Sequence, residues 1–316
     1  MQALVINEHG GVDKFQKTDV PTPKVDNDEL LVETHAFSVN PMDIAGRQGI
    51  LPKEFTSKWK TFPIILGWDV AGKVVKKGAN VKNFQVGDAI FAELPTSHSN
   101  LNGAYADYAV VKEGQTALKP PSLSFDQAAA LPIAGGTAYK AIEKNLKVKA
   151  SDKLLIQGGA GGVGLFAIQL ARNLGAHIAT TASPNHKKLL EDLGADQVIN
   201  YHKTPVSQVL SNYDKVFDTV GDITQGFQAL KNGGQLVTII GQPTDAQLHD
   251  PTKGFMFQMG PETAKDISGF FGWQGKNQIQ IIISKTYPYT VSGIKAAHRQ
   301  IETHHTTGKL VVHVKD

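Results

Sequence analysis

The sequence predicts a two-domain α/β protein, in which a β-barrel-like domain precedes a doubly wound parallel sheet. Three observations support this prediction. The chain has 316 residues, a length typical of about two domains. Short β-like runs broken by turn residues fill its first 122 residues, which is typical of a compact all-β unit. From about residue 124 apolar strands alternate with amphipathic helices, which indicates βαβ units.

The composition excludes several classes of protein. Hydrophobic residues make up 41% of the chain and charged residues 19%, as in packed globular proteins. A net charge of +3 gives no reason to expect nucleic acid or an anionic membrane as a partner. The cysteine count is zero, which excludes disulfides and cysteine-ligated zinc. Neither a signal-peptide pattern nor a membrane-length apolar run is seen, so we expect a cytoplasmic, soluble protein.

The N-terminal elements are short strands. Apolar and β-branched residues predict strands at 2–7, 29–37, 70–76 and 89–92. Clusters of Gly, Pro, Asn and Asp separate them. Close spacing of such short strands favours a β-barrel.

The second pattern begins with a helix. Ser124 followed by Gln127 is a possible capping box. Strands are then predicted at 153–157, 177–181, 197–200, 215–219 and 235–240, and helices at 163–174 and 187–193. Alternation of this kind predicts a parallel sheet that is covered on both faces.

The C-terminal tail departs from the βα repeat. We expect strands at 255–259, 278–284 and 310–314, with helices at 261–273 and 292–303. We expect the tail to return to the first domain. The predicted domains are therefore 1–123 together with 263–316, and 124–262.

A glycine-rich turn joins the first of these strands to its helix. The residues are Gly159, Ala160, Gly161, Gly162, Val163 and Gly164, which match G-x-G-x-x-G. The pattern is specific here because it follows a predicted strand and begins a helix. Glycine permits a tight turn and a close approach of a pyrophosphate, and the helix N–H groups then hold the anion. The segment predicts a Rossmann dinucleotide-binding domain.

The end of the second strand indicates which dinucleotide binds. NAD sites place a carboxylate about 20 residues after the turn, but no Asp or Glu occurs between Gly158 and Glu191. Thr181 and Ser183 can instead hydrogen-bond the ribose, and Lys187 or Lys188 can pair with a 2′-phosphate. We therefore expect NADPH, with the choice between the two lysines left open.

These segments resemble the zinc-independent medium-chain dehydrogenases/reductases, most closely the quinone oxidoreductase and alkenal reductase group that includes zeta-crystallin. Besides the glycine turn, the matching segments are SVNPMDIAGRQG (38–49), GWDVAGKVVKKGANVKNFQVGDAIFA (67–92), GAYADYAVV (103–111), LPIAGGTAYKAI (131–142), LGADQVINY (193–201), DKVFDTVGD (214–222), GGQLVTIIG (233–241) and GKLVVHV (308–314). The resemblance implies a GroES-like β-barrel catalytic domain, a Rossmann domain, and an active site in the cleft between them. It also implies a homodimer that forms by strand pairing of the Rossmann sheets.

The zinc ligands of the alcohol dehydrogenases in this superfamily are absent. Gly67, Trp68 and Asp69 stand where those enzymes have G-H-E, and Trp cannot ligate zinc. We expect no metal, with Trp68 filling the space that a metal would occupy.

Two candidate catalytic residues come from the resemblance. Asn40 belongs to an N-P-x-D segment that lies beside the nicotinamide in the family. Its amide could hydrogen-bond the substrate oxygen or the ribose. Alternatively, Asn-Pro is a turn signal, and Asp43 could stabilise the first turn of a helix. Many relatives carry Tyr where this chain has Ala45, so Arg47 is a candidate substitute, with a surface charge as the alternative.

Further cofactor contacts are implied by position in the family. Thr137 matches a position near the nicotinamide, and Tyr201 a position that packs on the adenosine. Gly221 and Gly241 end successive strands at the expected cofactor edge of the sheet. Around Phe257 the family's backbone meets the carboxamide. Ordinary helix, strand and turn roles are the alternatives for all five residues.

The implied activity is hydride transfer from NADPH to a quinone or an α,β-unsaturated carbonyl. Such acceptors need no metal because the anion that forms is delocalised, so positioning and an oxyanion donor are sufficient. Two alternatives remain open, namely an enoyl thioester reductase and a structural or sensor protein that binds NADPH with low turnover.

Overall fold

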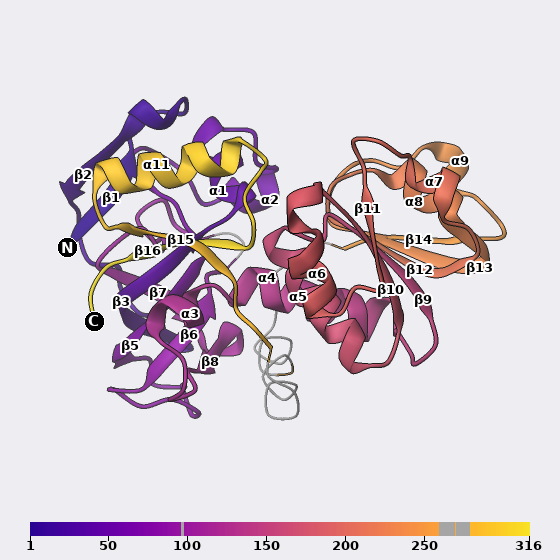
Figure 1. Cartoon of the computed structure of the whole chain (residues 1–316). Coiled ribbons are helices and arrows are strands. Elements are labelled where there is room, and N and C mark those ends of the chain that lie inside the picture. Colours follow the sequence, from indigo (N-terminus) through magenta and orange to yellow (C-terminus); the bar gives the residue numbers. More distant parts are fainter. Residues whose placement is uncertain (96–97, 259–268, 270–278) are drawn as a thin grey trace. The chain divides into compact units, whose positions relative to one another are not determined.

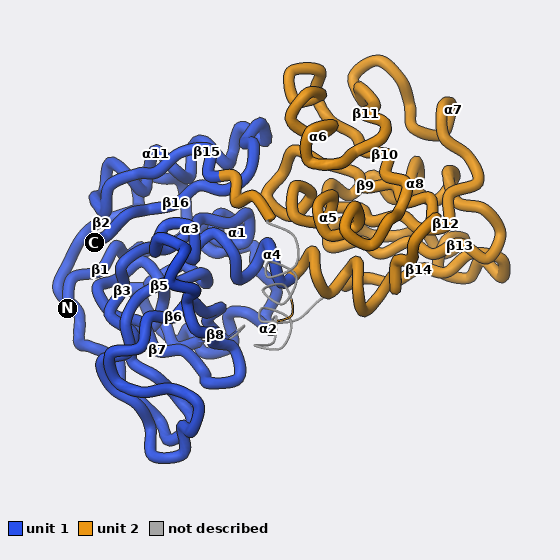
Figure 2. Tube along the Cα trace, turned by 60° about the horizontal axis from the view of Figure 1, so that its bottom comes forward, with its two compact units in different colours: residues 1–136, 261–268, 283–316 blue, residues 137–260, 269–282 orange. Residues whose placement is uncertain are grey.

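The computed structural model divides the chain into two compact units (Figures 1 and 2). It describes residues 1–95, 98–258, 269 and 279–316. Unit 1 comprises 1–136, 261–268 and 283–316, and unit 2 comprises 137–260 and 269–282. The sequence places the start of the second domain at residue 124, whereas the structure keeps α3 (Phe125–Ala129) in unit 1. The reason is packing, because the rings of His35 and Phe125 stack at 4.1 Å.

Unit 1 is built from two antiparallel-rich sheets. One has the strand order β2-β1-β4, and the other has the order β15-β16-β3-β5-β6-β8 with β7 paired to β3. The strands are β1 (Gln2–Ile6), β2 (Phe15–Asp19), β3 (Glu29–Val39), β4 (Ile64–Ile65), β5 (Asp69–Lys77), β6 (Ala89–Glu93), β7 (Tyr108–Lys112), β8 (Thr116–Leu118), β15 (Ile283–Pro288) and β16 (Lys309–His313). The helices are α1 (Pro41–Gln48), α2 (Lys53–Thr56), α3, α11 (Val291–Glu302) and the short 3-10 turns η1 (Val12–Lys14) and η2 (Glu113–Gln115). The prediction of a β-barrel-like domain for this region is confirmed, but the region is not all-β, because α1 and α2 lie between β3 and β4.

The C-terminal tail returns to unit 1, as expected. Strand β16 pairs antiparallel with β3, and β15 pairs parallel with β16, so α11 is the crossover helix between them. The strand predicted at 278–284 begins instead at Ile283. Its residues from Lys285 to Pro288 are mostly polar, and pairing with β16 rather than hydrophobicity defines this strand. The helix predicted at 261–273 and Met259 lie outside the described residues.

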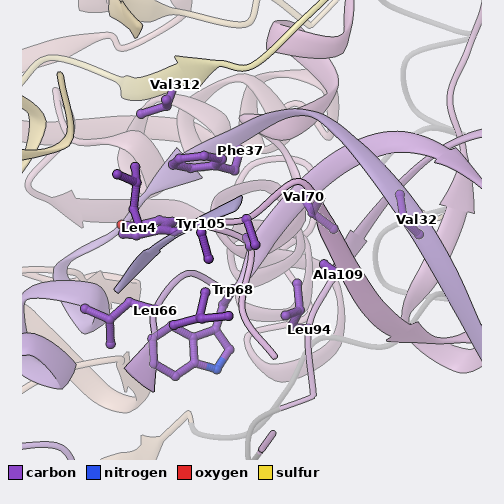
Figure 3. Close-up of a cluster of buried hydrophobic side chains, with 14 of the residues drawn as sticks. Leu4, Val32, Phe37, Leu66, Trp68, Val70, Leu94, Tyr105, Ala109 and Val312 are labelled. Carbon is purple, nitrogen blue, oxygen red and sulfur yellow. The ribbon is translucent and has the colours of Figure 1, made fainter. Parts of the chain in front are cut away.

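The core of unit 1 surrounds Trp68, which is fully buried (Figure 3). Phe37 and Tyr105 stack in the same cluster with ring centroids 4.6 Å apart. The side chain of Val312, from β16, belongs to the cluster as well, so residues from both ends of the chain share one core. Burial of such large side chains stabilises the unit by about 1.5–3 kcal/mol for each.

A buried polar network connects α1 to α11 within unit 1. Arg47 is fully buried, and its guanidinium donates to His298 Nδ1, to the Gly10 carbonyl and to Glu302. Burial lowers the pKa of His298 to about 3, so the ring is neutral. Because Arg47 can only donate, Nδ1 must accept and Nε2 must carry the proton. The Tyr105 hydroxyl lies 3.1 Å from that Nε2.

Unit 2 contains a parallel sheet of six strands in the order β11-β10-β9-β12-β13-β14. Its strands are β9 (Lys153–Gln157), β10 (His177–Ala182), β11 (Gln197–Asn200), β12 (Tyr213–Asp218), β13 (Leu230–Thr238) and β14 (Gly254–Phe257). Its helices are α5 (Gly162–Asn173), α6 (Lys187–Leu193), α7 (Val206–Val209), α8 (Ile223–Ala229), α9 (Asp245–Leu248) and the 3-10 turn η4 (Pro184–His186). Helix α4 (Pro132–Tyr139) crosses the boundary, with its residues up to 136 in unit 1, and the π-helical segment η3 (Lys140–Asn145) follows it in unit 2. The predicted doubly wound order is confirmed.

Local signals explain several element boundaries. The capping box of α3 is present, with Ser124 accepting from the Gln127 N–H at 3.1 Å. Strand β13 begins at Leu230, five residues before the predicted start at 235, because Leu230 already pairs with Tyr213 of β12, and an irregularity separates this pair from the pairing that resumes at Gln235. Among the described residues, no helix is long and apolar enough to cross a bilayer.

Candidate active site

The glycine turn of unit 2 follows β9 and begins α5. Gly158 has φ of +81°, one residue before the G-x-G-x-x-G run, so the left-handed turn residue lies outside the predicted motif. A Cβ on Gly159 would lie 2.0 Å from Thr180 Oγ1, and one on Gly164 would lie 2.3 Å from the Gly158 carbonyl oxygen. These two positions admit only glycine, because a larger residue would separate the helix from the sheet.

The start of α5 offers an anion site. Gly161 is the N-cap, and the N–H groups of Gly162, Val163 and Gly164 belong to the first turn, where a helix has no internal acceptors. A Cβ on Gly161 would meet only the Gly158 carbonyl oxygen, at 3.4 Å. The protein therefore leaves room beside this turn, next to Ala160, and the residues present fit a pyrophosphate.

The end of β10 separates two residues that the sequence groups together. Thr181 Oγ1 accepts the Gly158 N–H at 2.9 Å, and the Thr181 side chain is buried. Ser183 is only partly buried, and its hydroxyl lies 3.4 Å from the Tyr201 hydroxyl and 3.3 Å from His202 Nε2. Thr181 thus supports the turn from inside the sheet, whereas Ser183 and the half-exposed Tyr201 meet at its edge.

The two candidate lysines begin α6 and differ in their partners. Lys188 Nζ lies 3.0 Å and 3.2 Å from the carboxylate oxygens of Asp192. Lys187 Nζ lies 3.7 Å from Glu191, a looser pair, and its side chain is 62% exposed. Lys187 therefore has the weaker ion pair to break when it binds a phosphate.

The turns after β12 and β13 lie side by side. Gly221 and Gly241 have φ of +86° and +94°, and a Cβ on Gly241 would lie 3.2 Å from the Gly221 Cα. Asp218 supports the first turn by accepting the N–H groups of Val220, Gly221 and Asp222. Burial raises the pKa of this carboxyl group, although those N–H groups act against the rise. Sequence reasoning did not identify this supporting role.

Gln258 follows Phe257 in the chain and connects the end of β14 to Thr137. Its Nε2 donates to the Thr137 carbonyl at 3.1 Å, and its Oε1 accepts from Asn145 Nδ2 at 2.7 Å. The preceding residue, Phe257, ends β14 with 37% of its surface exposed. The structure therefore brings Thr137 and the end of β14 together within unit 2, through a glutamine that the sequence analysis did not consider.

In unit 1, the buried carboxylate of Asp69 is the centre of the polar cluster around Asn40. It accepts hydrogen bonds from Ser38 Oγ, Asn40 Nδ2, Lys309 Nζ and the Ile133 N–H. The Asn40 and Lys309 bonds measure 2.9 Å and 3.3 Å. Lys309 Nζ also donates to Asn40 Oδ1, so the three side chains form a closed triangle. Sequence reasoning singled out Asn40 but not Lys309, because a lysine before an apolar strand gives no sign of burial.

Asp43 lies in the first turn of α1, as the sequence suggests. Its Oδ2 accepts the Asn40 N–H at 2.7 Å, so the expected role in the first turn is confirmed. Burial raises the pKa of Asp43 to about 7, while the Asn40 N–H and the nearby Tyr105 hydroxyl lower it. The Asn40 side chain is directed to Asp69 and Lys309. The backbone N–H of Asn40 therefore caps α1, whereas its side-chain amide hydrogen-bonds the polar cluster.

Arg47 is not on the surface. The surface-charge alternative is wrong, because the residue is fully buried and its donors contact His298, Gly10 and Glu302. These partners belong to α11 and to the loop after β1, and the sequence could not reveal that α11 returns against α1.

Trp68 lies in the core near two other aromatic rings. The centroids of Trp59 and His98 lie 6.1 Å and 5.1 Å from the Trp68 centroid. Within the described parts of the chain, His, Asp and Glu side chains form no group of three that could hold a metal ion.

Comparisons with known proteins agree with the two-unit architecture. Residues 26–121 match the family model of the alcohol dehydrogenase GroES-like domain, and residues 193–312 match that of the zinc-binding dehydrogenases. The chain is 32% identical to an NADPH-dependent alkenal/one oxidoreductase of Arabidopsis thaliana chloroplasts, over 99% of this chain and 79% of that protein. It is also 32% identical, with the same coverage, to a 2-methylene-furan-3-one reductase of Solanum lycopersicum.

Solved structures agree with the same two-unit architecture. A quinone oxidoreductase from Coxiella burnetii superposes with a TM-score of 0.88 at 31% identity, over 100% of this chain and 99% of that one. A mycobacterial protein complexed with NADPH superposes with a TM-score of 0.85 at 26% identity, over 99% of this chain and 100% of the other.

Two alanine substitutions separate the two uses of glycine in the turn. Gly159→Ala places a Cβ against Thr180, so we expect a lower melting temperature and a loss of NADPH affinity of at least about tenfold, which corresponds to 1.4 kcal/mol. Gly161→Ala meets no protein atom closely, so it should keep the melting temperature and lose affinity only. Differential scanning calorimetry and NADPH fluorescence titration measure both effects.

Gly114→Ala is the matched control, because nothing lies within 4 Å of a Cβ at that position. An unchanged melting temperature for Gly159→Ala would contradict the packing described for the turn.

Proposed function

The chain belongs to the zinc-independent quinone oxidoreductase group of the medium-chain dehydrogenases/reductases, and on that basis we propose that it reduces quinones or α,β-unsaturated carbonyls with NADPH. The observation that carries this proposal is the glycine turn of unit 2 together with a 2′-phosphate region that contains lysine and lacks a carboxylate. The relatives named above include an NADPH-dependent alkenal/one oxidoreductase, so both the cofactor and the acceptor class agree with the residues.

NADPH would supply a hydride when bound, and this chain's residues would hold it. The pyrophosphate would bind the N–H groups at the start of α5, from Gly162 to Gly164. Ser183 and Tyr201 would contact the adenosine ribose and ring, and Lys187 would pair with the 2′-phosphate. The backbone at Gly221, Gly241 and Phe257, together with Thr137, would contact the nicotinamide half.

Asn40 is the proposed contact to the substrate oxygen. Its amide has two N–H groups, and the bond to Asp69 uses one of them. The second can donate to the carbonyl or quinone oxygen, on which negative charge develops as the hydride arrives. For Arg47 we propose a structural role instead of a catalytic one, because its donors already hold α11 against α1.

We also propose a homodimer and a cytoplasmic location. Strand β14 is an edge of the sheet in unit 2, and its Met256 and Phe257 are 38% and 37% exposed. An open apolar edge favours pairing with another strand. Some relatives are named chloroplastic or mitochondrial, so cell fractionation decides the location, and light scattering decides the oligomeric state.

A turnover screen tests the activity. The protein is mixed with NADPH or NADH and with 1,4-benzoquinone, an alkenal or crotonyl-CoA, and loss of absorbance at the nicotinamide band is followed. We expect NADPH to be oxidised with the quinone or the alkenal, because these acceptors delocalise the new charge. Preference for crotonyl-CoA would favour an enoyl thioester reductase. Tight NADPH binding without turnover would contradict the proposed enzyme.

The lysine assignment is tested by two adjacent substitutions. Lys187→Ala should weaken NADPH binding about 10- to 100-fold and leave NADH unchanged, because one charge-assisted hydrogen bond of about 1.5–3 kcal/mol is lost. Lys188→Ala is the matched control, since this lysine pairs with Asp192 and should change neither affinity. Fluorescence titrations of both cofactors give the result, and a larger effect for Lys188→Ala would reverse the assignment.

A further inference from the structure

The polar cluster around Asp69 fixes the direction in which the Asn40 amide faces. A lysine can only donate, and a carboxylate can only accept. Lys309 must therefore bond Oδ1 of Asn40 and Asp69 must bond Nδ2, as the structure has them. The oxygen and nitrogen ends of the amide cannot exchange without placing like partners together. The Asn40 side chain holds this orientation in a buried position, with 4% of the residue exposed.

Lys309 is a buried lysine. It begins β16, is 5% exposed, and its ammonium lies 3.3 Å from the fully buried carboxylate of Asp69. Lysine is rarely buried unless it is paired. Strand β16 reaches this cluster only because the tail returns and pairs with β3, which places Leu310 opposite Val39. The chain thus brings a positive charge from its C-terminal strand to the segment that begins α1.

The charge acts through the amide. An ammonium that donates to Oδ1 draws electron density toward the carbonyl end, and hydrogen bonds in such a chain strengthen one another. The remaining N–H of Asn40 is then a stronger donor than it would be without Lys309, and this effect offsets the opposing one of the bond from the same nitrogen to Asp69. In a buried environment this effect is larger than in water, because the effective dielectric constant is lower.

We propose that Lys309 is a positioning residue that supplies charge through Asn40 to the substrate oxygen, and that it matters most for α,β-unsaturated carbonyls. This inference rests on the proposed function. Hydride adds to the β-carbon, the C=C electron pair shifts to form the enolate, and the negative charge moves to the carbonyl oxygen beside Asn40. The α-carbon then takes a proton from solvent. A quinone forms an aromatic hydroquinone anion that is already delocalised, so it depends less on this donor.

A double-mutant cycle tests the inference. Asn40→Ala, Lys309→Gln and the double variant are compared by kcat/KM for an alkenal and for 1,4-benzoquinone, by NADPH affinity, and by melting temperature. Removing an oxyanion donor costs about 10²–10³-fold in rate, so we expect a loss of that order with the alkenal for Asn40→Ala and about tenfold for Lys309→Gln. The double variant should be no slower than Asn40→Ala, because the lysine acts through that amide.

Two further readouts separate positioning from folding. Loss of a purely structural lysine would lower alkenal and quinone turnover by the same factor, whereas we expect a larger loss for the alkenal at unchanged NADPH affinity. Lys309→Arg keeps a charge against Asp69 and should recover much of the alkenal activity. If Lys309→Gln does not fold, the cycle is run with Lys309→Arg. Any loss of alkenal kcat/KM that Lys309→Arg causes must then vanish in the Asn40→Ala background. Lys315→Gln, on an exposed lysine paired with Glu33, is the control.

The outcomes distinguish the two proposals. Wild-type protein that turns over no quinone or enone would overturn the proposed function and this inference with it. Wild-type turnover with independent, multiplicative losses in the cycle, or with equal losses for both acceptors, would overturn the inference alone. Non-additive losses confined mainly to the alkenal would support both.

Discussion

The hydrogen bonding of one buried carboxylate, Asp69, organises unit 1. A buried charge is costly unless it is paired and hydrogen-bonded, and among the residues that the structure describes Asp69 has four donors, which come from β3, the start of α1, α4 and β16. Meeting that requirement fixes the segment that carries Asn40. It also explains why the tail must return, since the only ammonium among these donors belongs to Lys309. Removing one partner of a buried pair commonly costs about 3–5 kcal/mol, so this cluster stabilises unit 1.

In unit 2, buried polar side chains fix the backbone at the carboxyl end of the sheet. Backbone groups that would face a dinucleotide are held from behind by buried side chains, namely Thr181 under the glycine turn and Asp218 under the turn at Gly221. Gln258 does the same between Thr137 and Asn145. These polar side chains hydrogen-bond the backbone and fix its conformation. The N–H groups at the start of α5 are left to bind an anion. Preorganisation of this kind lowers the cost of binding.

Sequence reasoning predicted the elements well where the signal is local. Hydrophobic periodicity located β9, α5 and α6, and the capping box of Ser124 located α3. It could not reveal contacts between distant segments. Arg47 was interpreted as a surface or catalytic charge because its partners His298 and Glu302 lie some 250 residues away. Lys309 and Gln258 were missed for the same reason, because their burial depends on tertiary packing rather than on neighbours in the chain.

The role assigned to Thr181 shows the same limit at short range. The sequence places it near the ribose, and it is the second-last residue of β10, but its hydroxyl faces inward to Gly158. Strand alternation alone does not indicate which of two faces a hydroxyl serves when both are covered. This chain directs a hydride from NADPH to the carbon framework of a conjugated carbonyl. Incubation with 4-deuterated NADPH and an alkenal, followed by mass spectrometry and NMR of the product, tests this transfer directly. We predict one deuterium at the β-carbon and a hydrogen from solvent at the α-carbon, whereas product without deuterium from either C4-labelled form would contradict hydride transfer from NADPH.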